Sequence, residues 1–127
     1  MPVHDEMRWE VPLELSEEEE KICARCKRTG RLFAFLRRHR HQLCPRPLEK
    51  KMVALYSQSP LGRPPLPPSM LWMVTLLQAH EGVSDAAAVE ESLFNRRWQM
   101  VLDCLGTQRP PFSQGARHCW MKVAVTS

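Results

Sequence analysis

The feature that most constrains this chain is an apolar run with a helix start before it and a helix stop after it. Residues 70–77 read Met-Leu-Trp-Met-Val-Thr-Leu-Leu, residues 67–69 read Pro-Pro-Ser, and Gly82 follows the run at a short distance. Proline and serine are favoured where a helix begins, and glycine readily adopts the left-handed conformation that ends one. Because this helix is apolar nearly all round, we expect it at the centre of a small helical domain. At about 12 residues it falls short of the ~20 that a bilayer requires, so we expect no membrane span.

A second helix is expected directly after a tight turn. Ser84 is a favoured N-cap, and Asp85 places a negative charge at the positive end of the helix dipole. Ala86, Val89 and Leu93 fall on one face at helical spacing. The two helices together predict a helix-turn-helix-like central unit.

The N-terminal part of the chain predicts an extended arm followed by two helices. Residues 1–15 are expected to be extended, because Trp9, Val11, Leu13 and Leu15 alternate with Glu10, Pro12 and Glu14. Ser16 followed by Glu19 is a capping box, so a helix is expected from Glu17 to about Lys27. A longer helix is expected over Arg31 to Leu43. Its predicted inner face consists of Leu32, Phe35, Leu36, His39 and Leu43.

The rest of the chain predicts two more helices, a linker and an irregular end. Leu48, Met52, Leu55 and Tyr56 form the expected inner stripe of a helix that follows Pro47. Residues 57–68 hold five of the eleven prolines and predict a stiff linker. A last helix is expected near Asn95 to Leu105, with Trp98, Val101 and Leu102 facing inward. Residues 116–127 lack helical periodicity, so we expect an irregular tail. The predicted fold class is all-α, a small multi-helix domain.

Charge is distributed unevenly, although the net charge is only +4. Residues 1–20 hold eight acids and one base, whereas residues 21–51 hold eleven bases and one acid. A basic block of this density favours a polyanion such as nucleic acid, and the alternative is a solvated helix surface. Arginine forks bind phosphate well. The predicted DNA-contacting residues are Arg37, Arg38, Arg40, His41, Lys50, Lys51, Arg96 and Arg97.

The cysteines allow one candidate metal site. Cys23, Cys26, His39 and Cys44 have spacings that resemble a Cys3His zinc site, but they fall in segments expected to be helical. The alternative, buried thiols and a core histidine, is favoured. The five cysteines follow no secretory signal, so we expect reduced thiols, a cytoplasmic location and no cofactor. No constellation of residues indicates an active site.

The segments 66–85 and 96–106, with Pro-Pro-Phe-Ser-Gln-Gly at 110–115, resemble the N-terminal domain of bacterial DDE-type insertion-sequence transposases. The segment 31–41 is also similar. The resemblance implies that residues 1–115 bind the terminal inverted repeats of the element and associate with the nucleoid. In the family an RNase H-like catalytic domain follows, with an acidic triad that holds two metal ions. No residue here corresponds to that triad, so we expect no enzymatic activity.

The sequence departs from the family pattern at Ala116. Residues 116–127 look like out-of-frame translation, so we expect a truncated or frameshifted transposase. A second hypothesis is an oligomerisation module that pairs with itself or with full-length transposase and inhibits it, through apolar surface exposed near Trp98 and Leu102. A third is a non-functional remnant.

Overall fold

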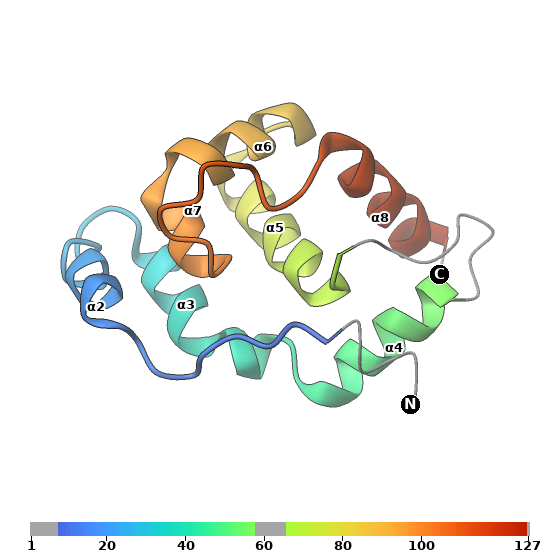
Figure 1. Ribbon diagram of the computed structural model, residues 1–127, viewed down its shortest axis with the longest axis horizontal. Helices are drawn as coiled ribbons and strands as arrows, with labels where there is room; N and C mark the ends of the chain where they lie inside the picture. Colours follow the sequence, from blue (N-terminus) through green and yellow to red (C-terminus); the bar gives the residue numbers. More distant parts are fainter. Residues whose placement is uncertain (1–7, 58–65, 127) are drawn as a thin grey trace.

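The computed structural model describes residues 8–57 and 66–126 of the chain. Over these ranges the chain forms helices joined by turns and contains no strand, so the all-α prediction is confirmed (Figure 1). The proposed linker lies mostly outside the described residues. The helices are α2 (Glu17–Ala24), α3 (Arg31–Leu43), α4 (Arg46–Ser57), α5 (Pro68–Glu81), α6 (Asp85–Phe94), α7 (Arg96–Val101) and α8 (Gln114–Thr126).

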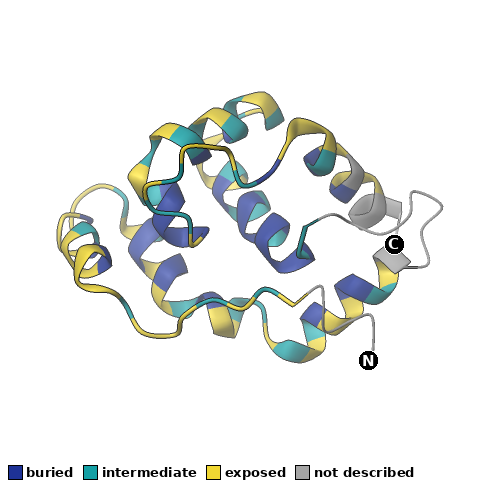
Figure 2. Ribbon diagram, viewed as in Figure 1, coloured by how far each residue is buried: buried dark blue, intermediate teal, exposed yellow. Residues whose placement is uncertain are grey.

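Helix α5 is the centre of the core, as its apolar sequence predicts. Leu71, Met73, Val74 and Leu77 are fully buried, and α5 packs against α4, α6 and α8 (Figure 2). The helix ends at Gly82, whose φ of 67° is left-handed. Over the described residues, no helix combines the length and the apolar character needed to cross a membrane.

The turns between helices also follow the sequence signals. Ser16 and Glu19 form the expected capping box at the start of α2, and Ser84 Oγ accepts a hydrogen bond from the Ala87 N–H at the start of α6. The Gly82–Ser84 turn therefore joins α5 and α6 closely. Whether this pair serves as a DNA-binding helix-turn-helix stays a prediction.

The inner face of α3 differs most from the prediction. In α3 the buried residues are Phe33, Ala34, Leu36, Arg37 and Arg40, whereas Phe35, expected inside, is 48% exposed. The helix is rotated because two arginines, counted as surface residues, are buried with hydrogen-bond partners.

Helices α4 and α6 show smaller errors of the same kind. In α6 the buried residues are Ala88 and Ser92, and Ala86 is exposed. In α4, Met52 is buried as expected, but Leu55 is 40% exposed. Trp98, Val101 and Leu102 are buried as expected, although α7 ends at Val101.

The prediction of an irregular tail is wrong. Residues 114–126 form α8, which packs against α5 and α6 (Figure 1). Ser113 Oγ accepts a hydrogen bond from the Ala116 N–H, and the Trp120 indole donates to Thr75 Oγ1 at 3.1 Å. The sequence does not show an apolar helical face here, because the buried face of α8 includes a charged residue. Arg117 lies on the same face as Trp120 and is buried. The out-of-frame origin of the segment stays a prediction.

Candidate nucleic-acid interface

Arg37 is fully buried, where it joins three segments of the chain. Its Nε donates a hydrogen bond to Glu19 Oε2 at 2.6 Å, and its Nη2 donates to Glu19 Oε1 at 3.1 Å. The same guanidinium donates to the carbonyl oxygens of Leu13 and Glu14 in the N-terminal arm. Its charge is therefore used inside the protein and cannot reach a phosphate.

Arg40, one turn further along α3, is 1% exposed. Its Nη1 donates to the carbonyl oxygens of Met100 and Val101 at the end of α7, and its Nη2 donates to the Pro12 carbonyl at 3.0 Å. Burial, together with the neighbouring Arg37 charge, lowers the pKa of Arg40 to about 10, so the side chain is still protonated at pH 7. Both arginines are structural, and their burial leaves neither guanidinium exposed for the DNA contact predicted from the sequence.

The other predicted DNA-contacting residues are on or near the surface. Arg97 is half-buried, with its guanidinium 5.6 Å from the centroid of the Phe33 ring and against Gly30. At Gly30, φ is 77°, so a larger residue would be strained there as well as meeting Arg97. The exposed members of the set are Arg38, His41, Lys50, Lys51 and Arg96.

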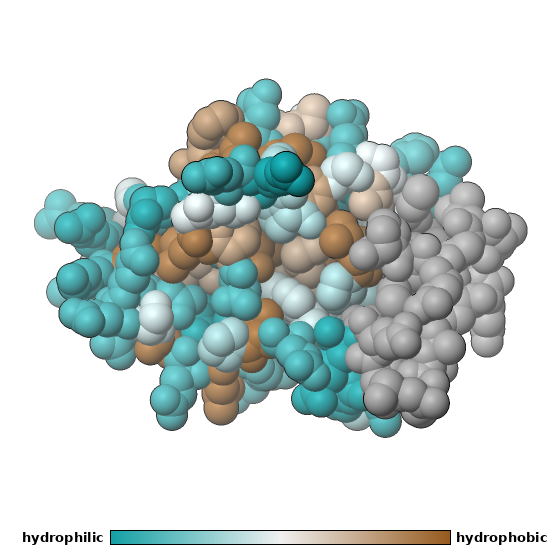
Figure 3. All heavy atoms as spheres, viewed as in Figure 1, coloured by the Kyte–Doolittle hydropathy of each residue, from teal (hydrophilic) through white to brown (hydrophobic). Residues whose placement is uncertain are grey.

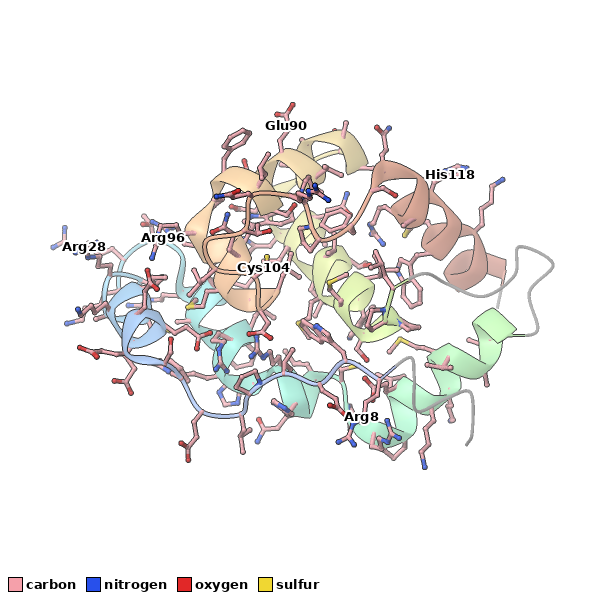
Figure 4. All side chains as sticks on the ribbon, viewed as in Figure 1. Arg8, Arg28, Glu90, Arg96, Cys104 and His118 are labelled. Carbon is pink, nitrogen blue, oxygen red and sulfur yellow. The ribbon has the colours of Figure 1, made fainter. Side chains whose placement is uncertain are left out.

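These residues do not form one patch. Lys50 and Lys51 lie on α4, whereas α2 and the start of α3 form the opposite end of the molecule (Figure 1). Figure 4 shows Arg28 at the outer edge of that opposite end and Arg96 beside it, where Arg96 reaches Glu18 of α2. The structure thus brings together an exposed basic group that the sequence analysis had not assigned. Its members are Arg25, Lys27, Arg28 and Arg31, from the end of α2, the turn and the start of α3.

A local signal could have identified this group. Residues 27–31 read Lys-Arg-Thr-Gly-Arg, a cation-rich turn between two helices, and turns lie on the surface. The surface over this end is strongly hydrophilic (Figure 3). We call Arg25, Lys27, Arg28 and Arg31 the turn cluster.

Acidic residues of α2 lie beside the turn cluster and have cationic partners. Arg96 forms an ion pair with Glu18, and Lys21 Nζ lies 3.9 Å from Glu17 Oε1. Glu19 is paired with Arg37 inside the protein. The negative charge of α2 is therefore largely compensated where it approaches the basic surface.

The four candidate zinc ligands do not converge. Cys23 Sγ contacts Met100 Sδ at 3.7 Å, Cys44 Sγ donates to Ser69 Oγ at 3.0 Å, and His39 Nδ1 lies 2.6 Å from Gln42 Oε1. Burial raises the pKa of the Cys23 and Cys44 thiols, which disfavours the thiolate form that binds zinc. Among residues 8–57 and 66–126, no three His, Cys, Asp or Glu side chains are placed to hold a metal ion.

Comparison with protein families supports the resemblance to transposases that the sequence showed. The family model described as "Transposase domain (DUF772)" matches residues 29–115, and the chain belongs to this transposase-domain family. The match includes α3 to α7, the buried arginines and part of the turn cluster. No curated protein and no solved structure matches the chain.

Proposed function

We propose that this chain is the DNA-docking domain of a DDE-type insertion-sequence transposase and binds the terminal inverted repeats of its element. The observation that carries the proposal is the match to a transposase domain, which contains a helix with exposed cations and no acidic residue, α3. A basic surface of this kind binds the phosphate backbone by releasing condensed counterions.

The residues that we propose to contact phosphate differ from those predicted from the sequence. Arg37 and Arg40 leave it because they are buried, and the turn cluster joins it because its members are exposed. His41 and Arg96 stay in the set, Arg97 contributes through the part of its side chain that is accessible, and Arg38 is exposed for contact with DNA on the outer side of α3. Lys50 and Lys51 on α4 would meet DNA only where the duplex extends or bends toward that helix.

Docking, and not strand cleavage, is the role that we assign to this domain. Two-metal phosphoryl transfer needs several carboxylates that converge on the ions. Within the described part of the chain, no group of three suitable side chains meets that requirement.

The oligomerisation hypothesis loses the surface on which it depended. Trp98 is fully buried and Leu102 is 2% exposed, so neither forms an apolar contact surface. Self-association and pairing with full-length transposase are therefore secondary hypotheses.

The test is a fluorescence-anisotropy titration of a labelled duplex that carries the terminal repeat, with a scrambled duplex of equal length as the control. We expect tighter binding to the repeat, and a fall of orders of magnitude between low and near-physiological salt. Equal and weak binding to both duplexes would exclude docking on the repeats. Size-exclusion chromatography of the same samples separates this result from self-association.

A further inference from the structure

We propose that the outer face of α3 is the surface that reads bases in the major groove of the repeat. The inference rests on the proposed function and adds the element that recognises sequence. It differs from the usual arrangement of a helix-turn-helix, in which the second helix would read the bases and would here be α6.

The outer face of α3 is a single straight stripe. Arg31, Phe35, Arg38 and Gln42 follow one another at intervals of four, three and four residues, which places them on one side of a helix. All four are exposed.

The opposite side of α3 is anchored firmly. Phe33 and Leu36 are each 2% exposed, and Arg40 binds carbonyl oxygens at the end of α7. Arg37 ties the middle of the helix to Glu19 and to the arm. The direction of the outer stripe is therefore fixed before any DNA binds, which lowers the entropic cost of recognition.

The side chains of the stripe match the chemistry of the major groove. Arginine forks pair with guanine O6 and N7, a glutamine amide pairs with adenine N6 and N7, and an apolar ring can contact the thymine methyl group. The stripe supplies Arg38 for the first contact, Gln42 for the second and Phe35 for the third. Arg31, whose Nε donates to the Lys27 carbonyl at 2.7 Å, begins the stripe but acts with the turn cluster on phosphates.

His39 supports this arrangement from the side of the stripe. Its ring packs on Phe35 with the centroids 4.6 Å apart, and its Nδ1 lies 2.6 Å from Gln42 Oε1. This distance fits an Nδ1–H that donates to the amide oxygen. His39 thus holds both Phe35 and the Gln42 amide in position.

Size and charge also favour α3 over the other helices. Its 13 residues span about 20 Å, and a major groove about 12 Å wide admits one helix. The turn cluster continues from its N-terminal end, where it would meet the phosphates at the edge of the groove. Helix α6 instead carries Asp85, Glu90 and Glu91, which phosphates would repel. Helix α5 is buried.

The experiment compares two kinds of substitution by anisotropy on the repeat and on the scrambled duplex. Gln42→Ala and Arg38→Gln should each reduce the preference for the repeat by about tenfold, because a bidentate base contact contributes discrimination of that order. Arg28→Gln, the matched control in the turn cluster, should weaken binding to both duplexes equally and leave the preference unchanged. Thermal melting of each variant checks that the fold is retained.

A second measurement places the helix in a groove. Methylation of guanine N7, which lies in the major groove, should block binding of the wild-type chain at specific positions of the repeat. If wild type prefers the repeat while Gln42→Ala and Arg38→Gln keep that preference in full, the inference about α3 is wrong and DNA docking stands. If wild type shows no preference at all, the proposed function fails and the inference fails with it.

Discussion

Arg37 and Glu19 form a buried ion pair with two hydrogen bonds, one of 2.6 Å and one of 3.1 Å. The same carboxylate accepts the Ser16 N–H at 2.8 Å and so completes the capping box of α2. The same guanidinium donates to the carbonyl oxygens of Leu13 and Glu14. One pair of side chains therefore fixes the start of α2, the rotation of α3 and the path of the arm.

Replacing Arg37 should test how strongly this pair stabilises the domain. Arg37→Met leaves Glu19 buried without its partner, and loss of one member of a buried pair costs about 3 kcal/mol or more. Arg38→Met is the matched control, since the neighbouring side chain is exposed, and its effect should stay within about 0.5 kcal/mol. Urea unfolding followed by circular dichroism measures both. Equal stability of the two variants would contradict the structural role of Arg37.

The segment Arg-Arg-His-Arg-His at 37–41 shows what a single sequence could and could not reveal. Its helical conformation and the bounds of α3 were predictable from spacing and from the flanking glycine and proline. Which arginines face inward was not, because that depends on acceptors far away in sequence. The acceptors of Arg40 are the carbonyl groups of Pro12, Met100 and Val101.

Predictions that depend on local sequence are confirmed elsewhere in the fold, and those that depend on distant contacts are not. The core of α5 and the caps of α2 and α6 depend on local sequence, and the structure confirms them. The docking of α8 depends on Arg117, a buried cation that bonds to Gln78 on α5, so hydropathy alone did not reveal the helix. The turn cluster could have been predicted from the sequence. The denser basic segment at residues 37–41 was predicted to contact DNA in its place.

Glu19 should make the stability of the domain depend on pH in acid. Burial alone would raise its pKa, but hydrogen bonds from Arg37 and the Ser16 N–H, with the charges of Arg37 and Arg40, outweigh it and hold the pKa below its usual 4.5. The ionised carboxylate therefore stabilises the folded state fully above about pH 4.5, and this contribution is lost as the pH falls through the lowered pKa of the folded state.

The measurement is the free energy of unfolding of wild type and Glu19→Gln between about pH 6 and pH 2.5. The gap between the two curves should be widest near pH 6 and should shrink toward the acid end. Glu17→Gln, which removes an exposed carboxylate from the same helix, should follow the wild-type curve. A constant gap for Glu19→Gln would show that its ionisation is not linked to folding.

Trp120 should report whether α8 is docked in solution. The side chain is 5% exposed and its indole N–H donates to Thr75 on the central helix, so Trp120→Ala should cost about 3 kcal/mol. Met121 is the next residue and is 36% exposed, so Met121→Ala should reduce the free energy of unfolding far less. Thermal unfolding separates the two. Equal effects of the two substitutions would mean that α8 does not pack on α5 in solution.

Glu18 should restrain DNA binding through its ion pair with Arg96. Glu18→Gln removes a negative charge beside the basic surface and releases Arg96 for a phosphate, so affinity for the repeat should rise several-fold at low salt. Because one more cation then displaces counterions, the dependence of the binding constant on salt should steepen by about one unit in a log–log plot. Glu20→Gln removes an equal, exposed charge from α2 on another side of the helix and serves as the control for charge alone. If both variants raise affinity equally with unchanged salt dependence, Arg96 does not contact the backbone, and the binding surface is confined to the turn cluster and α3.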